Sequence, residues 1–308
     1  ESAADLEEFH VDVSLVMRHE SFNSSMIYEV FARNLAKCEK LRRLKVFNHA
    51  IIRGGISTYS NGFLRALVPA IEGGRSTLEE VTLLIGNSPA SNRTSSKEIE
   101  ATARDLFAAI LSLREMREFN LQLNLASSPL LNIFLRACED VRRNFGSLPS
   151  SGSIQKFTLS CVLYKVPDGV PDPLPAPCSL VSCLALLGPH AAGLRTFMIR
   201  APSACWDYNS VSALQGLLSN KPSMRQLGLY FHGYECTSGR CLEYILGYIR
   251  ERENCSDNLI HISGLECYNT RFDEEEALDR YHSRQGQKCL SYDEKGLTFK
   301  ARGNMVSW

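Results

Sequence analysis

The stretch Glu39–His49, EKLRRLKVFNH, sets a pattern that most of the chain repeats. Three apolar residues within it, Leu41, Leu44 and Val46, are spaced three and then two positions apart. Charged residues occupy the positions between them, and an amphipathic helical run precedes the stretch. Alternation of apolar and polar residues is typical of a strand with one buried face. We therefore interpret the stretch as the strand of one structural unit.

The same apolar pattern recurs along the chain at near-even intervals. The starting residues of successive copies lie 35, 37, 38, 38, 40, 30 and 35 positions apart. A series at such intervals indicates a repeat architecture, although a single copy would not. The other copies are Leu6-x-x-Phe9-x-Val11, Leu78-x-x-Val81-x-Leu83, Met116-x-x-Phe119-x-Leu121, Ile154-x-x-Phe157-x-Leu159, Leu194-x-x-Phe197-x-Ile199, Met224-x-x-Leu227-x-Leu229 and a weaker last one, Leu259-x-x-Ile262-x-Gly264.

Helical runs separate these copies. Apolar stripes at helical spacing occur at 99–110, 131–141, 211–218 and 242–249, with a less regular one at 63–71 that contains Pro69. Asn209 or Ser210 has the polar side chain expected of the cap before the run that begins at Val211. Each unit is thus predicted to contain a strand, a loop and a helix. Stacked units would bury one continuous core.

The Leu-x-x-Leu-x-Leu pattern, with one strand and one helix in each unit, resembles the leucine-rich repeat family over residues 6–265. The units are longer than the family's usual 20–29 residues. The Asn or Cys that the family places three positions after the third apolar residue is kept at Asn124 and Cys267. Long, irregular units of this kind are similar to those of fungal F-box-type proteins. The resemblance implies an α/β solenoid with parallel strands on the concave side and helices on the convex side.

The end of the chain departs from the repeat. The acidic run Asp273–Glu276 suits the first turn of a short helix. Apolar residues then alternate on both sides of Asp293–Gly296, which is typical of a hairpin. We predict a solenoid over residues 1–270 and a C-terminal capping element, a short helix plus a hairpin, over residues 271–308. The proline-rich segment 167–177 is interpreted as an insertion in one unit, because the repeat resumes after it.

The resemblance also implies which residues face the concave side, namely those between and just after the apolar positions. Their charge changes sign along the series, whereas a groove that follows phosphates would stay basic. A mixed face with aromatic and Met anchors suits a protein partner. A merely solvated inner surface is the alternative. The candidate partner-binding residues on this face are Arg43, Lys45, Phe47, Glu80, Glu118, Asn120, Lys156, Met198, Arg200 and Tyr230.

Three further aromatic candidates, Trp206, Tyr208 and Tyr234, follow strands of the same array. Loops at one edge of a rigid scaffold are common binding sites. A Trp in a long loop can equally serve to pack the loop against the core. Both interpretations of these residues stay open at this point.

Composition gives no support for a nucleic-acid or membrane partner, because 34 basic and 34 acidic residues balance. No apolar run reaches the length of a membrane span, and no signal peptide is visible. The eleven cysteines are odd in number and scattered, and Cys38, Cys138 and Cys183 fall on apolar helix faces. We interpret them as reduced core cysteines of a cytoplasmic or nuclear protein. Disulfides in a secreted recognition protein are the alternative.

Sequence motifs of enzymes and cofactor sites are missing. We find no phosphate-binding glycine loop, no His-Glu-x-x-His and no Gly-x-Ser-x-Gly. The group His232, Cys236 and Cys241 matches no zinc framework. We expect a non-enzymatic protein-binding or scaffold module without metal or cofactor, which acts within a larger complex. The resemblance implies one form of it, the substrate-reading part of an F-box-type ubiquitin-ligase adaptor. The alternative is an enzyme with titratable residues converging near His232 or Asp207.

Overall fold

The structure, a computed structural model, describes the cores of the successive units and leaves out most of the segments between strands and the following helices. The described residues are 5–12, 30, 33–48, 58–73, 76–86, 96–125, 129–150, 154–163, 179–188, 193–201, 205–219, 226–235, 259–266, 290–293 and 296–300. The proline-rich segment 167–177, the predicted helix at 242–249 and the acidic run at 273–276 lie outside these residues. So do Ser127 and Ser128, which precede the helix that starts at Pro129.

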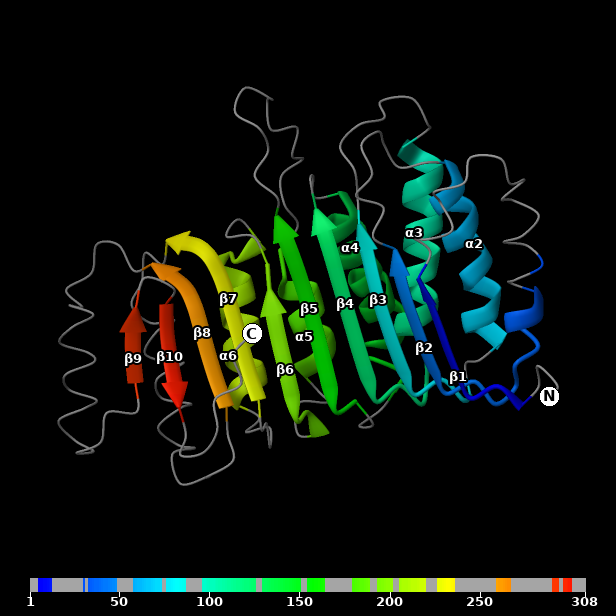
Figure 1. Cartoon of the computed structure of the whole chain (residues 1–308). Coiled ribbons are helices and arrows are strands. Elements are labelled where there is room, and N and C mark those ends of the chain that lie inside the picture. Colours follow the sequence, from blue (N-terminus) through cyan, green and yellow to red (C-terminus); the bar gives the residue numbers. More distant parts are fainter. Residues whose placement is uncertain are drawn as a thin grey trace.

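The described strands form one ten-stranded sheet in which β1 to β8 follow one another in sequence order and pair in parallel (Figure 1). A hairpin, β9 and β10, completes the sheet by antiparallel pairing of β10 with β8. The strands are β1 Glu8–Asp12, β2 Arg43–Asn48, β3 Glu80–Gly86, β4 Glu118–Leu125, β5 Lys156–Leu163, β6 Thr196–Arg200, β7 Gln226–Glu235, β8 Leu259–Glu266, β9 Leu290–Asp293 and β10 Gly296–Lys300.

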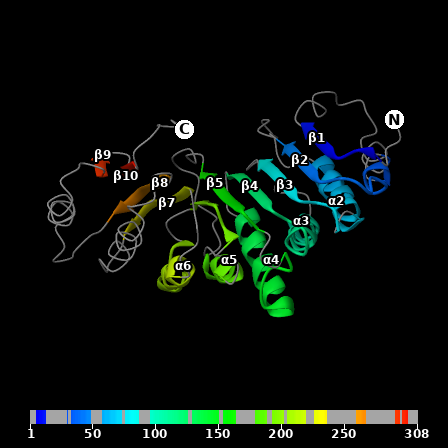
Figure 2. The same cartoon turned by 90° about the horizontal axis from the view of Figure 1, so that it is seen from below.

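The described helices alternate with the strands and cover one face of the sheet. They are α2 Thr58–Gly73, α3 Ser96–Leu111, α4 Pro129–Phe145, α5 Val181–Leu187 and α6 Tyr208–Ser219. Seen from below, the strands form a shallow arc with the helices on its outer side (Figure 2). A parallel sheet needs a crossover between successive strands, and one helix in each unit supplies it. The chain is therefore an α/β protein whose arrangement is compatible with a solenoid.

The register of the sheet aligns the apolar positions of successive units. Val46 pairs with Leu83, Leu83 with Leu121, and Leu121 with Leu159, and all four are at most 1% exposed. A slip by one residue would turn this row toward solvent, so burial specifies the register. The starting residues Leu41, Leu78, Met116, Ile154 and Leu194 are equally buried, whereas Leu6, in the first unit, is 37% exposed.

The second apolar position of three neighbouring strands is phenylalanine. Phe119, Phe157 and Phe197 pair in register, with ring centroids 5.4 and 6.2 Å apart. Phe134 of α4 packs on Phe119 at 5.9 Å and on Phe107 of α3 at 5.4 Å. These aromatic side chains join the centre of the sheet to the helices that cover it.

One sequence prediction about the array is wrong. We placed Ile262 in the second apolar position of the last copy and Gly264 in the third. The register instead pairs Ile260 with Leu227 and Ile262 with Leu229, two residues earlier. The β-branched Ile260 and Ile262, which favour a strand, take the register positions of Leu227 and Leu229. Asp257 then stands in the sequence where the first apolar residue was expected. Cys267 consequently loses its match to the family position that it had in the shifted alignment.

The hairpin predicted around Asp293 and Gly296 is present, and it extends the same sheet beyond β8. A hairpin that adds antiparallel strands to the end of a parallel array covers the edge of the last parallel strand. The boundary at residue 270 and the short helix of the cap stay predictions. The helix with Pro69 also forms, since α2 runs through this residue.

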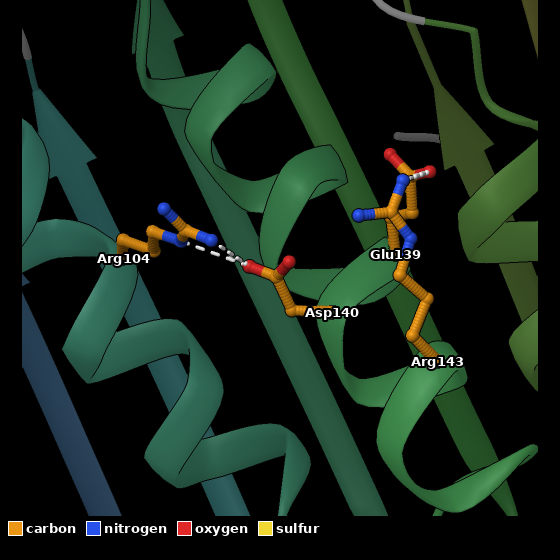
Figure 3. A network of polar contacts seen from close by, with 4 residues as sticks. All are labelled: Arg104, Glu139, Asp140 and Arg143. Atoms are coloured by element: carbon orange, nitrogen blue, oxygen red, sulfur yellow. Dashed lines mark hydrogen bonds and ion pairs between the residues drawn. The ribbon is translucent and has the colours of Figure 1, made fainter.

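Ion pairs join neighbouring helices on their outer surface (Figure 3). Arg104 of α3 donates from Nε and Nη2 to Oδ2 of Asp140 on α4, at 2.8 and 2.5 Å. On another side of α4, Arg143 pairs with Glu139 one turn earlier, at 2.5 Å. Exposed pairs of this kind contribute at most about 1 kcal/mol each, so packing dominates the helix layer.

The described cysteines support the interpretation as core thiols. Cys38, Cys138, Cys161, Cys183 and Cys205 are free and buried. Burial, and then contact with the Cys183 thiol, raises the pKa of the Cys138 thiol, so that the unreactive thiol form is favoured. The other six cysteines lie outside the described residues. Among the helices that the structure describes, none has both the length and the apolar character to cross a membrane.

Candidate functional site

The face of the sheet opposite the helices, here called the open face, carries the predicted concave residues. They fall into three rows that run across the strands. The first row contains Arg43, Glu80, Glu118 and Lys156, which are register neighbours. The second contains Lys45, Asn120 and Met198, with Thr82 and Thr158 between them. The third contains Phe47 and Arg200, with Leu84, Gln122 and Ser160 between them. Tyr230 holds the next register position of this row, but its side chain lies outside the described part.

The charges at one end of the open face neutralise one another across strands. Glu8 of β1 lies 2.8 Å from Lys45 Nζ and 3.5 Å from the Arg43 guanidinium. The hydrogen bond from Lys45, followed by the charge of Arg43, lowers the pKa of the Glu8 carboxyl. Lys156 of β5 pairs with Glu118 of β4 at 3.3 Å. Opposite charges on facing residues favour the observed register. Part of the predicted binding set thus also has a structural role.

The third row supplies the apolar part of the open face. The Phe47 ring is partly buried and lies 4.8 Å from the ring of His10 on β1, at a tilt of 56°. Leu84, the neighbour of Phe47 on β3, is only 7% exposed although its strand position points away from the helices. Met198 on β6 is partly exposed. Phe47 and Met198 are uncharged, so a partner can contact them without breaking an ion pair, whereas Leu84 is already buried.

The prediction that Trp206 anchors a partner at the rim is wrong. Its side chain is 1% exposed and belongs to the main hydrophobic core, where it is the largest fully buried residue among those described. The other interpretation, that the Trp packs its loop against the core, is correct. Tyr208 is the first residue of α6 and Tyr234 lies in β7, but their side chains and that of His232 lie outside the described part.

A polar cluster that the sequence analysis missed joins the starts of α5 and α6. Asp207 Oδ1 accepts hydrogen bonds from Ser179 Oγ at 2.8 Å, Ser210 Oγ at 2.6 Å and the Ser210 backbone N–H at 2.7 Å. Ser179 Oγ in turn accepts from the Val181 N–H at 3.1 Å. Asp207 is therefore the N-cap of α6, in place of the Asn209 or Ser210 that we expected. The available signal was an Asp directly before the first residue of the helix.

This cluster is arranged for capping. The enzyme alternative requires titratable residues that converge near Asp207, and Ser179 and Ser210 do meet it. However, Asp207 Oδ1 and both hydroxyls are occupied by backbone groups and by one another, including a bond from Ser210 Oγ to the Cys205 carbonyl at 3.1 Å. Within the described residues, no three His, Cys, Asp or Glu side chains are placed to hold a metal ion.

The capping cluster predicts a dependence of stability on pH. Partial burial raises the pKa of the Asp207 carboxyl, but the hydrogen bonds from Ser210 and Ser179 outweigh burial and set the pKa below its usual value. A lowered folded-state pKa means that the stabilisation is present above the unfolded pKa of about 3.9 and is lost as the pH falls through the folded-state value. We expect Asp207→Ala to lower the free energy of unfolding by about 1–2 kcal/mol at neutral pH.

Urea denaturation of wild type and Asp207→Ala at neutral pH and at successively lower pH tests this prediction. The difference in unfolding free energy between them is expected to shrink as the pH falls from the unfolded pKa of about 3.9 to the lower folded-state pKa of Asp207, and to stay small below it. Asp105→Ala, at an exposed position of α3, is the control and should leave stability nearly unchanged. If the difference in unfolding free energy between wild type and Asp207→Ala persisted in strong acid, Asp207 would not act through its charged carboxylate.

Comparison with known proteins adds no relative, since no family model matches the chain and no curated protein does.

Proposed function

We propose that the chain is a leucine-rich-repeat-type solenoid that binds a partner protein through its open face and has no catalytic activity of its own. One observation carries the proposal. Three rows of charged, polar and apolar side chains, most of them partly exposed, lie at the spacing of the strands on the face opposite the described helices. Rigid elements that hold such rows can present a preformed surface to a partner.

The repeat-family part of the proposal is supported by the regular pairing of the apolar positions. Each of the first seven described strands pairs in parallel with the next at equivalent positions. One helix separates most of them, always on the same side of the sheet (Figure 2). Asn124 of β4 matches the family's asparagine position, and its register partner in the next unit is Val162 of β5. The resemblance to the family is therefore partial.

The protein-partner part is supported by the mixture of side chains on the open face. Ion pairs at Glu8 and at Glu118 leave little net field to attract a polyanion. Phe47, Met198 and Arg200 are of the residue types that contribute most to protein interfaces. The further proposal of a ubiquitin-ligase adaptor rests on the resemblance to F-box-type proteins alone.

Site-specific crosslinking tests the proposal. A photoreactive amino acid at Asn120, in the centre of the open face, is expected to capture a defined protein from native extract. The photoreactive amino acid placed instead at Arg136, on the exposed side of α4, is the matched control and should not capture that protein. The captured protein, once purified, is expected to bind the Asn120→Arg variant at least tenfold more weakly, which corresponds to about 1.4 kcal/mol.

Capture of the same protein from both positions, or undiminished binding by Asn120→Arg, would contradict recognition through the open face. Because Asn120 is only partly buried, this substitution should leave the thermal unfolding temperature close to that of wild type. If the unfolding temperature of Asn120→Arg dropped strongly, the binding measurement would use Lys45→Glu and Met198→Glu instead, because both residues lie in the same row.

A further inference from the structure

A second ordered set of side chains lies along the edge of the sheet where the parallel strands begin. It is formed by the residue directly after the first apolar position in successive units. We call this set the edge row; among the described residues it consists of Glu7, Arg42, Glu79, Arg117, Gln155 and Arg195. Up to Gln155 the carbonyl of each of these residues accepts two N–H groups of the next unit, such as those of Gln155 and Lys156 on Arg117 at 2.7 and 3.0 Å. These bonds hold the row at the spacing of the strands.

The charge of the edge row is uneven. Glu79 lies between two arginines, 3.9 Å from the Arg42 guanidinium and 3.6 Å from that of Arg117. Both arginine side chains are more than half exposed, whereas that of Glu79 is not. Beyond Arg117 the row continues with a neutral Gln155 and an exposed Arg195. Three arginines against two glutamates give the described edge row a net charge of +1, with both glutamates in the part of the row nearer β1.

In the part of the chain that the structure describes, neighbouring charges do not remove this excess. Arg114 and Glu115, in the turn after α3, are exposed and of opposite sign. Lys156, next to Gln155, is paired with Glu118. The basic residues at the end of α4, Arg142 and Arg143, are explained by the negative end of the helix dipole. Arg117 and Arg195 stand at the starts of strands, where no helix dipole accounts for them.

We propose that the edge row from Arg117 to Arg195 binds an acidic segment of a partner protein, a function separate from recognition by the open face. The two arginines are two strands apart, which is about 10 Å. Carboxylates a few residues apart in an extended segment can reach both of them, and a guanidinium binds a carboxylate through two parallel hydrogen bonds. Glu79 and the neutral Gln155 interrupt the positive charge, which disfavours a continuous phosphate backbone as the ligand.

Fluorescence anisotropy with a labelled poly-glutamate peptide at low ionic strength tests this proposal. The double variant Arg117→Gln/Arg195→Gln is expected to bind the peptide about threefold to tenfold more weakly than wild type. The control variant Arg65→Gln/Arg136→Gln removes the same charge from exposed positions of α2 and α4 and should bind like wild type. Raising the salt concentration should abolish the difference between the variants.

Three results would overturn the proposal. The first is that the wild-type chain does not bind the peptide. The second is that the control variant loses as much affinity for the peptide as the edge-row variant does. The third is that an oligothymidylate of equal charge binds to the wild-type chain more tightly than the peptide does. Because the substituted arginines are exposed, circular dichroism should show that both variants remain folded.

Discussion

Replacement of Phe157 by alanine is expected to lower the free energy of unfolding by about 3–5 kcal/mol. Phe157 is 1% exposed on β5, in the interior of the sheet, with the rings of Phe119 and Phe197 on either side. Removal of the ring deletes apolar burial and leaves a cavity that the rigid strands on both sides cannot close. The expected loss is large against the typical stability of a folded domain, about 5–15 kcal/mol.

Chemical denaturation of the variant, with circular dichroism as the readout, measures this loss. Phe145→Ala is the matched control, because Phe145 at the end of α4 is 58% exposed and its removal should change stability by no more than about 0.5 kcal/mol. Equal effects of the two substitutions would mean that the phenylalanine row is not the centre of the core.

Trp206→Ala is expected to destabilise the fold by a similar amount, about 3–5 kcal/mol. The indole is buried in the main core just before α6, next to the cluster around Asp207 that caps this helix. Loss of the indole would loosen the start of α6 as well as the core. A surface anchor would behave differently, because its removal would weaken binding and leave the stability almost unchanged.

Denaturation curves measure the loss of unfolding free energy in Trp206→Ala, and fluorescence gives an independent check of the burial of the indole. In a Trp308→Phe background the remaining emission comes from Trp206 alone, since the chain contains two tryptophans. That emission should be blue-shifted in the folded protein and should shift to the red as the protein unfolds. Asn209→Ala, at an exposed position of the first turn of α6, serves as the control. Red-shifted emission from the folded protein would contradict burial of the indole.

Much of the fold could be predicted from local periodicity. The spacing of Leu41, Leu44 and Val46 recurs with Phe, Met and Ile in the same positions, and the register of the sheet follows it from β1 to β7. For the last copy the sequence pattern favours the wrong alignment, because the apolar Leu259 matches the first apolar position and Asp257 does not. The sheet instead selected the register that places Ile260 and Ile262 in line with Leu227 and Leu229.

The candidate site was predicted less completely. The alternation of side chains along each strand places Arg43, Lys45 and Phe47 on the open face. The same local pattern could not reveal that Glu8, from a different unit, lies against both Arg43 and Lys45. Specificity on this face is therefore expected to rest more on uncharged residues such as Phe47 and Asn120 than the sequence suggests.

The sequence by itself determined the order of strands and helices and which strand positions face the core, because these depend on spacings within a few residues of one another. Only the tertiary structure decided that Trp206 is buried, that Asp207 caps α6 together with Ser179 of the preceding unit, and that the charges of the open face pair across strands. These features depend on which units come together in space. Residues about thirty positions apart along the chain meet there because each strand lies beside its predecessor.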